Sequence, residues 1–321
     1  MVKAIGLISG GLDSILAVRM ILEQNIQVIG VCFTSPFFDN SQTVQEICKK
    51  LQIKLKIIKC GTDYIEIIKH PRYGYGKNLN PCIDCHAYML KKARQVMTQE
   101  NADFVFTGEV LNERPMSQNR QALSNIERLA GLTGRLLRPL SAKLLEITIP
   151  EQMNLVDRSK LGQISGRSRK PQLLLAKYYG IEEIPQPAGG CLLTDPNYSK
   201  RLKDALSHHE ETFDDFELLK IGRHFRLPDG AKIIVGRNQS ENERLLKLTN
   251  KADLIIEPSE TTGPLVLVFN SKDREQAKNF AVGLCSYYSD KNNTNLVKVK
   301  VNSIIIEAHP ISKKLIEQMR I

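Results

Sequence analysis

The stretch Ser9-Gly10-Gly11-Leu12-Asp13-Ser14 decides the fold of this 321-residue chain, because it joins two apolar segments of different period. Residues 4–8 before it predict a buried strand, whereas residues 15–24 repeat apolar positions at helical spacing. Glycine lets a backbone approach a ligand without a Cβ clash, and the N–H groups at a helix start attract anions. The junction therefore predicts a phosphate-binding turn, with its serine hydroxyls as donors and its aspartate facing Mg²⁺.

Strand-like and helix-like segments alternate through residues 1–110. The expected elements cover residues 3–8, 15–24, 26–33, 41–51, 54–59, 87–99 and 103–107. Alternation with apolar strands predicts a parallel sheet that is covered by helices on both faces. Ligands of such sheets bind at the carboxyl ends of the strands, and Ser9, Thr34 and Thr107 all follow a predicted strand.

The chain is long enough for two domains. Pro185, Pro187 and Pro196 indicate a boundary, so we expect an α/β domain over residues 1–195 and a smaller α+β domain over residues 196–321. The first domain carries an insertion over 62–81 and long loops with helices over 111–195. The second is expected to contain a hairpin at Asp229-Gly230, a helix over 240–249, strands over 252–257 and 264–269, a helix over 272–286, strands over 295–300 and 303–308, and a terminal helix.

Composition narrows the class of protein. The formal net charge is +10 at pH 7, which suits a polyanionic partner. The chain has no uninterrupted apolar run of about 18 residues and no signal-peptide pattern at its start. We therefore expect a cytoplasmic protein with free thiols and no membrane association; the sequence leaves its oligomeric state open.

The basic residues are densest between Arg158 and Lys177, where no acidic residue interrupts them. Residues 162–170 contain little to bury and predict a loop. Five cations of the stretch from Arg158 to Lys177 are candidates for contact with RNA phosphates: Arg158, Lys160, Arg167, Arg169 and Lys170. The alternative interpretation is an ordinary solvated surface.

Three of the seven cysteines lie outside apolar core patterns. Cys32, Cys48, Cys60 and Cys285 are typical of small buried hydrophobic residues. Cys82 and Cys85 stand three apart after Pro81, near a predicted helix start, which places both sulfurs on one face and favours a lowered thiol pKa. Cys191 follows Gly189-Gly190, a pattern that predicts a tight turn presenting a thiol.

Several hypotheses for these three thiols stay open. A structural zinc ion prefers four ligands, and His86, adjacent to Cys85, completes such a site only with awkward geometry. The Cys82-x-x-Cys85-His86 spacing also matches covalent haem attachment, although no export signal accompanies it. The remaining hypotheses are a catalytic cysteine persulfide pair, a [4Fe–4S] cluster on Cys82, Cys85 and Cys191 with one iron left open, and unbound structural cysteines.

Residues 9–14 resemble the PP-loop of the ATP pyrophosphatase superfamily. They differ from a Walker-type loop, which places Lys after its last Gly, because Leu12 follows Gly11. Enzymes of that superfamily cleave ATP between the α and β phosphates, adenylate a carbonyl oxygen and release pyrophosphate. The loop sequence alone does not distinguish the synthetases of that superfamily from its tRNA thiolases.

Three further segments extend the resemblance. Residues 104–110, followed by 114–118, and Arg138-Pro139-Leu140 are similar to segments of 4-thiouridine synthetases. Residues 218–242 resemble the NFACT RNA-binding module of ribosome-associated quality-control proteins. The chain thus looks like a tRNA thiouridine synthetase of the 4-thiouridine synthetase or 2-thiouridylase type, with an added RNA-binding module.

The resemblance implies ATP-dependent thiolation of a tRNA uridine that is flipped out of its stack. A uracil carbonyl oxygen is adenylated, and sulfur from an external donor, either sulfide or a cysteine desulfurase, then displaces AMP. ATP is expected on Ser9, Gly10, Gly11, Asp13, Ser14, Phe33, Thr107 and Gly108. The expected catalytic residues are Asp13, Cys85, Cys191 and Lys143, with Arg167 a further candidate for stabilising the transferring phosphate.

Two rival hypotheses come from other functional classes. A small-molecule amidating ligase of the same superfamily needs no set of three thiols. A non-catalytic RNA-binding quality-control protein needs no intact phosphate loop, and the complete Ser9–Ser14 string argues against that hypothesis.

Overall fold

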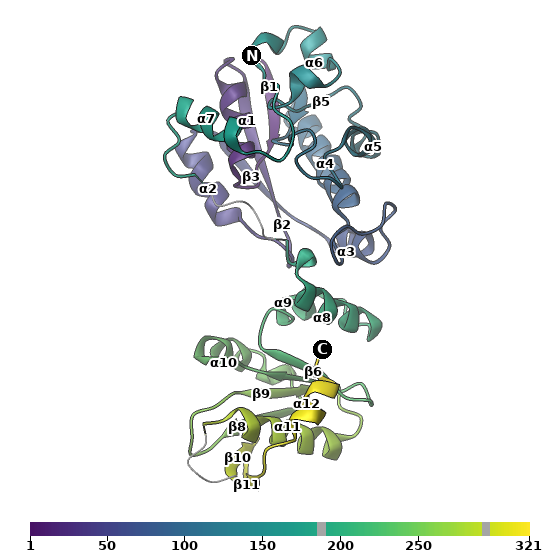
Figure 1. Cartoon of the computed structure of the whole chain (residues 1–321), viewed down its shortest axis with the longest axis vertical. Coiled ribbons are helices and arrows are strands. Elements are labelled where there is room, and N and C mark those ends of the chain that lie inside the picture. Colours follow the sequence, from purple (N-terminus) through teal and green to yellow (C-terminus); the bar gives the residue numbers. More distant parts are fainter. Residues whose placement is uncertain (185–190, 291–295) are drawn as a thin grey trace. The chain divides into compact units, whose positions relative to one another are not determined.

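The computed structural model describes residues 1–184, 191–290 and 296–321, and Figure 1 shows the course of the chain. It forms two compact units, Met1–Thr194 and Asp195–Ile321. Pro185, Pro187 and the turn expected at Gly189-Gly190 lie outside the described residues. Each unit has its own sheet and its own hydrophobic core.

The N-terminal unit contains a parallel sheet with strand order β3-β2-β1-β4-β5. Its strands are β1 (Lys3–Leu7), β2 (Gln27–Thr34), β3 (Lys54–Lys59), β4 (Phe104–Phe106) and β5 (Leu136–Leu137). The expected α/β fold with a parallel sheet is confirmed. The order places the carboxyl ends of β1, β2 and β4 next to one another, where a ligand site is expected.

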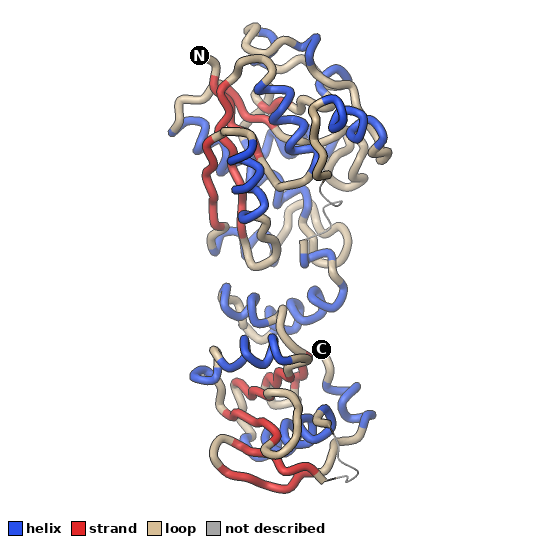
Figure 2. Tube along the Cα trace, turned by 90° about the vertical axis from the view of Figure 1, so that its left-hand side faces the viewer, coloured by secondary structure: helices blue, strands red, loops and turns tan. Residues whose placement is uncertain are grey.

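Helices cover both faces of this sheet (Figures 1 and 2). They are α1 (Leu12–Leu22), α2 (Ser41–Lys50), α3 (Thr62–Lys69), α4 (Cys82–Gln99), α5 (Arg120–Ala130), α6 (Ile149–Gln152) and α7 (Lys170–Tyr178), with 3-10 turns η1 (Ala142–Leu144), η2 (Arg158–Lys160) and η3 (Leu192–Thr194). Helices α1, α2 and α7 lie on one side, and α4 and α5 lie on the other. Among the described residues, no helix combines the length and apolar character needed to cross a bilayer.

Three helices differ from the expectation. Helix α1 begins at Leu12 rather than residue 15, because the Gly11 carbonyl accepts both the Ile15 N–H and the Ser14 hydroxyl. Helix α4 begins at Cys82, directly after Pro81. Helix α3 forms within the segment expected to be an insertion, since Tyr64, Ile65 and Ile68 give it a buried face. Its eight residues are too few for a clear periodic signal.

The C-terminal unit is built on an antiparallel sheet with order β11-β10-β8-β9-β7-β6. Its strands are β6 (Arg223–Arg226), β7 (Lys232–Val235), β8 (Leu254–Pro258), β9 (Val266–Phe269), β10 (Val297–Val301) and β11 (Ile304–Ala308). Its helices are α8 (Pro196–Ser207), α9 (Phe213–Leu218), α10 (Gln239–Leu246), α11 (Arg274–Tyr288) and α12 (Lys313–Met319), with 3-10 turn η4 (Thr249–Lys251). The expected second α+β domain is confirmed.

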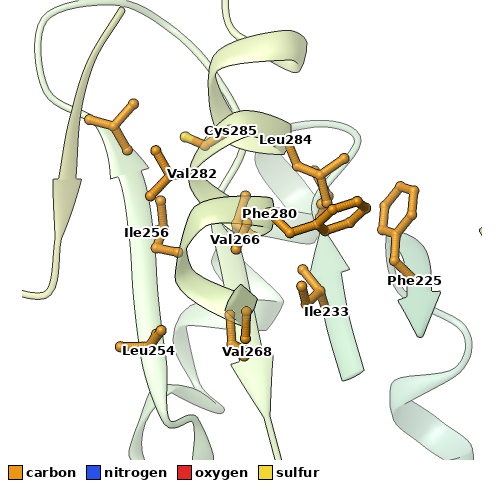
Figure 3. Packing of buried hydrophobic residues seen from close by; sticks show 14 of the residues in the cluster. Phe225, Ile233, Leu254, Ile256, Val266, Val268, Phe280, Val282, Leu284 and Cys285 are labelled. Carbon is orange, nitrogen blue, oxygen red and sulfur yellow. The ribbon is translucent and has the colours of Figure 1, made fainter. Parts of the chain in front are cut away.

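The core of this unit lies between α11 and the sheet (Figure 3). Phe280, Leu284 and Cys285 of α11 pack with strand residues such as Ile233 and Val266. The expected hairpin joins β6 to β7, and Gly230 adopts a left-handed φ of +95° in its turn. Burial of this apolar face is what stabilises the unit independently of any ligand.

Candidate active site

The loop between β1 and α1 has the conformation of an anion-binding turn. Gly10 has a left-handed φ of +82°, and Gly11 is extended immediately before the helix. Asn40 at the start of α2 holds the loop from the side, because its amide donates to the Ser9 carbonyl oxygen at 3.1 Å. The first backbone N–H groups of α1 therefore lie just after the end of β1, where they can donate hydrogen bonds to a phosphate group.

Gly108, directly after β4, packs against this loop. A Cβ atom at this position would lie 2.5 Å from the Ser14 nitrogen and 2.6 Å from the Asp13 carbonyl carbon. Such distances are far inside van der Waals contact, so only glycine allows this approach. The ends of β1 and β4 thus form one continuous surface.

A cavity of about 370 Å³ opens at these strand ends, which is within the range for small-molecule sites. Its lining includes the loop residues Ser9, Gly11, Asp13 and Ser14, the β2 residues Cys32 and Phe33, and the β4 end residues Thr107 and Gly108. Cys82, Cys85 and Cys191 line the same cavity. Segments that are far apart in the sequence therefore meet at one site.

Two carboxyl groups and two guanidinium groups line the cavity close to the loop. Burial raises the pKa of Asp13, and the nearby Arg169 and Arg114 oppose that rise. Burial and the neighbouring Asp13 raise the pKa of Glu113. Paired carboxylates beside two arginines provide both a metal-binding and a phosphate-binding arrangement.

A buried network of ion pairs and hydrogen bonds is centred on Glu109, close to Thr107. Glu109 accepts hydrogen bonds from Arg138 Nε at 3.0 Å and from the Thr107 hydroxyl at 3.0 Å, and it pairs with His86 Nδ1 at 2.8 Å. Arg138 also pairs with Glu127. Burial alone would raise the pKa of Glu109, but Arg138 and the hydrogen bond with His86 outweigh it and lower that pKa to about 2.

The three thiols are held in different surroundings. Cys85 is 8% exposed, and its sulfur lies 3.1 Å from the Tyr64 hydroxyl, while the Asn80 amide donates to the Cys82 sulfur at 3.2 Å. Burial raises the pKa of Cys85, and it raises that of Cys191 to about 11. The lowering expected for Cys85 from the helix start is wrong, because desolvation of the thiolate dominates.

The thiols do not form a single-ion site in this conformation. Within residues 1–184, 191–290 and 296–321, no group of three or more His, Cys, Asp or Glu side chains is placed to hold a metal ion. The cysteines expected in the core are buried, namely Cys32, Cys48, Cys60 and Cys285.

The expected basic residues separate into three groups. Arg169 lines the cavity. Lys143 is not among the lining residues, and its amine donates to the Ser159 carbonyl oxygen at 2.7 Å. Arg158 pairs with Glu151 at 2.5 Å and donates to the Leu145 carbonyl oxygen, whereas Lys160, Arg167 and Lys170 are exposed.

Sequence reasoning missed the roles of His86, Glu109, Glu113 and Arg114 in the lining of this cavity. One signal for Glu109 was present, because it follows the strand end Thr107-Gly108 and is a charged residue beside an apolar run. No periodic pattern connects it with His86, which comes from a different element. That pair is visible only once α4 and β4 lie side by side in the fold.

Two family models match the chain. Residues 2–144 match the family described as "Thiamine biosynthesis protein (ThiI)", and residues 222–319 match the "NFACT protein RNA binding domain". The first match lies in the N-terminal unit, and it makes residues 2–144 similar to PP-loop proteins of the ThiI family. The NFACT match lies in the C-terminal unit.

Two curated relatives are tRNA-specific 2-thiouridylases. MnmA 2 of Fusobacterium nucleatum is 32% identical over 107 residues, which cover 31% of each protein. MnmA of Proteus mirabilis is 28% identical over 141 residues, which cover 39% of this chain and 38% of the relative. The match therefore spans about a third of the length of these relatives.

Among the solved structures that match are two proteins of RNA modification. A predicted subunit of tRNA methyltransferase from Methanocaldococcus jannaschii is 16% identical with a TM-score of 0.39, covering 67% of this chain and 91% of that one. A 4-thiouridine synthetase in an RNA complex with bound ATP is 18% identical with a TM-score of 0.38, covering 67% and 53%.

Proposed function

We propose that the chain is an ATP-dependent tRNA sulfurtransferase that adenylates a uracil carbonyl oxygen and then replaces it with sulfur. The observation that carries the proposal is the meeting of the Ser9–Ser14 loop and three cysteines, Cys82, Cys85 and Cys191, around one cavity. An activated carbonyl and a sulfur-bearing group must lie within one small site for this chemistry. A family of thiouridylases and thiouridine synthetases supports the same assignment.

ATP binds with its phosphates on the loop and its adenine beside Phe33 and the Thr107-Gly108 strand end. Asp13 and Glu113 are the carboxylates suited to Mg²⁺, a hard cation that prefers oxygen ligands. Arg114 and Arg169 stabilise the negative charge on the phosphates and on the departing pyrophosphate. They take the place expected for Lys143 and Arg167.

The first step forms one bond and breaks one bond. The uracil carbonyl oxygen attacks the α-phosphorus, the bond between that phosphorus and the β-phosphate oxygen breaks, and pyrophosphate leaves. A sulfur nucleophile then adds to the activated ring carbon, and AMP departs with the original oxygen. Helix N–H groups and the two arginines lower the barrier of the first step by stabilising the negative charge on the phosphates.

The thiol set fits a [4Fe–4S] cluster chemically. Thiolates are the usual ligands of such clusters, and Cys82, Cys85 and Cys191 supply three soft donors in one cavity, whereas a closed zinc site needs a fourth. Among the described residues, these thiols line one cavity without forming a single-ion site, and a cluster spreads its ligands more widely than a single ion does. When bound, it supplies an open iron for sulfide; a persulfide on Cys85 or Cys191 is the alternative sulfur carrier.

The substrate in this proposal is tRNA, and sulfur comes from an external donor. The C-terminal unit supports tRNA as the partner through its RNA-binding family. Lys160, Arg167 and Lys170 remain candidates for phosphate contact, since their side chains are exposed. Because tRNA and free thiols occur together there, we expect the reaction in the cytoplasm.

Thiolation of tRNA transcripts tests the proposal. Full-length protein reconstituted anaerobically with iron and sulfide is incubated with ATP, Mg²⁺, sulfide and unmodified tRNA, and thiouridine is measured by mass spectrometry. We expect product from the wild type and none from Cys82→Ser, Cys85→Ser or Cys191→Ser. Cys48→Ser is the matched control, because Cys48 is a core-facing residue of α2 and does not line the cavity.

Either of two outcomes would contradict this assignment. Unthiolated tRNA after incubation with the reconstituted wild type would exclude thiolation, and full ATP turnover in all three cysteine variants would favour an amidating ligase. An anaerobic absorption spectrum with iron, zinc and sulfide counts distinguishes the cluster from zinc and from a persulfide.

A further inference from the structure

The N-terminal unit has a second hollow, which lies beside α7. It is a groove of about 750 Å³, and its lining comes from α1, from the segment 160–164 and from α7. Helix α7 lies next to α1 in the fold (Figure 1). None of the residues that line this groove lines the cavity at the Ser9–Ser14 loop. The groove is therefore a separate feature of the same unit.

Helix α7 contributes an apolar stripe that the fold covers only in part. Five residues at helical spacing line the groove, namely Pro171, Leu174, Leu175, Tyr178 and Tyr179. Leu175 and Tyr179 pack against buried core residues of this unit. Leu174 and Tyr178 are instead 71% and 72% exposed. Large apolar side chains that stay exposed next to a groove indicate a contact surface.

The ring of Tyr178 is held in position although most of it is exposed. It packs against the Tyr179 ring in a T-shaped arrangement, with the ring centroids 5.1 Å apart. The Tyr178 hydroxyl donates to the Glu23 carboxylate at 3.4 Å, and the Tyr179 hydroxyl donates to the same carboxylate at 2.8 Å. Because these contacts already order the side chain, a flat ligand that stacks on it costs little further side-chain entropy.

The surroundings of the groove are basic. Lys160 lines it, Lys170 and Lys177 are exposed on α7, and no acidic residue occurs in the sequence between 158 and 177. Among the described residues that line the groove, Glu23 is the carboxylate, and two tyrosine hydroxyls donate to it. Aromatic side chains inside a groove with cations around it match a nucleotide, whose base stacks while its phosphates meet the cations.

We propose that this groove binds an unpaired base of the tRNA substrate, stacked on Tyr178, with neighbouring phosphates on Lys160 and on the exposed lysines of α7. The inference rests on the tRNA substrate put forward above, and it adds a second contact to that substrate outside the candidate active site. Proteins that read single-stranded RNA stack its splayed bases on aromatic rings in the same way. A base inside a double helix has both faces covered by its neighbours, so the groove selects unpaired nucleotides.

Helix α7 connects the groove with the candidate active site. Arg169, directly before the helix, lines the cavity, whereas Tyr178 at the other end of the helix lines the groove. The nine residues of α7 rise about 13 Å along its axis, and about four stacked nucleotides of one strand span that distance. A base bound in the groove thus sets which uridine of the same strand reaches the cavity.

Equilibrium binding of the full-length protein to an unmodified tRNA transcript tests the proposal. Tyr178→Ala removes the ring, and we expect it to raise the dissociation constant at least about fivefold, as loss of one stack between a base and an aromatic ring implies. Tyr178→Phe keeps the ring and should bind like the wild type. Leu173→Ala is the matched control, because Leu173 is an exposed residue of the same helix and does not line the groove. Unchanged tRNA affinity in Tyr178→Ala would overturn the proposal.

The salt dependence of binding distinguishes a base contact from a phosphate contact. Tyr178→Ala should weaken binding at every salt concentration without changing the slope of log affinity against log salt. Lys160→Ala should reduce the magnitude of that slope by about one. A fully paired RNA duplex is the second probe, and Tyr178→Ala should bind it like the wild type. Equal losses with the transcript and with the duplex would overturn recognition of an unpaired base.

Two further readouts separate this inference from its rivals. Sedimentation equilibrium detects a second copy of the chain in the groove, and a wild-type dimer that dissociates in Tyr178→Ala would overturn the RNA assignment. Binding is measured without ATP and sulfide, so it does not depend on the reaction. Binding that requires Tyr178 in a protein that thiolates no tRNA would contradict the proposed function alone. Thiolation by a protein whose tRNA affinity is independent of Tyr178 would contradict the groove alone.

Discussion

The two units contain similar buried ionic networks that serve different ends. In the N-terminal unit Glu109 binds Arg138, and it also holds His86, which lines the cavity. In the C-terminal unit Glu210 binds Arg226 at 2.8 Å and Lys232 at 2.5 Å. The two glutamates are almost equally buried, at 8% and 9% side-chain exposure. Burial of an ion pair therefore does not by itself indicate a functional site.

The partners of each glutamate make the difference. Arg226 also binds Asp204 of α8 and the Gly230 carbonyl oxygen, so that network fastens a helix to the β6–β7 hairpin. The partners of Glu210 and Arg226 in that network all belong to elements of the C-terminal unit. The Glu109 network instead ends in His86, a residue that lines the cavity. An ionic network becomes a candidate for function where one member remains available to a ligand.

The largest expected effect comes from removing each glutamate in turn. Glu210→Ala leaves Lys232 buried without a carboxylate, and we expect it to lower the free energy of unfolding of the C-terminal unit by about 3–5 kcal/mol. Glu109→Ala should lower kcat/KM for thiolation about 100-fold, because His86 loses its orientation. Denaturant unfolding and thiolation per folded molecule measure the two effects. Unchanged thiolation in Glu109→Ala would remove the distinction between the networks.

Acid provides the second test. The pKa of Glu109 is lowered to about 2 from an ordinary 4.5, so its stabilisation is fully present above pH 4.5 and is lost as the pH falls toward 2. This shift corresponds to about 3 kcal/mol. We expect the unfolding free energy of the wild type to fall more steeply between pH 4.5 and pH 2 than that of Glu109→Gln. Parallel pH profiles would contradict a strongly paired carboxylate.

A third, smaller effect distinguishes two arginines of the same loop. Arg169→Ala should raise the KM for ATP about tenfold, because a guanidinium that stabilises phosphate charge is lost. Arg167→Ala is the control and should leave that KM unchanged, since Arg167 does not line the cavity. Steady-state kinetics with varied ATP measures both. A larger effect at Arg167 would restore the expectation drawn from the sequence.

The smallest effect concerns a cation expected to bind RNA. Arg158 pairs with Glu151 and donates to the Leu145 carbonyl oxygen, so Arg158→Ala should cost about 1 kcal/mol of stability. Lys160→Ala should leave stability unchanged and reduce the salt dependence of tRNA binding. Thermal unfolding and binding at several salt concentrations check this pair. An unchanged melting temperature in Arg158→Ala would show that its ion pair contributes nothing.

The sequence predicted most strands of each unit but missed β5 (Leu136–Leu137), which lies in a segment expected to contain helices and loops, and it did not predict the contacts between elements. Apolar runs and glycines predict β1, β2 and the loop at Ser9–Ser14, because each depends on local pattern. The order of the described elements after residue 220 follows from equally local signals, including the Asp229-Gly230 turn. Helix α3 was not predicted from the sequence, because eight residues are too few to show a helical period of apolar positions.

The candidate site was predictable only in part, since it depends on residues distant in the sequence. Cys82 and Cys85 are marked by their spacing, and the cavity contains both of them. The His86–Glu109 pair joins residues 23 apart, and no local pattern records it. Arg169 lines the cavity and Arg167 does not, although the two stand two residues apart, and composition does not encode that difference.

The contact at Gly108 has a consequence for how the two ends of the cavity move. The strand end that carries Thr107 and Glu109 rests directly on the backbone of Asp13 and Ser14, with no side chain between them. Main chain touching main chain cannot rearrange by a change of rotamer. The Ser9–Ser14 loop and the strand end at Thr107–Glu109 are therefore one rigid unit, which must shift as a whole or stay in place.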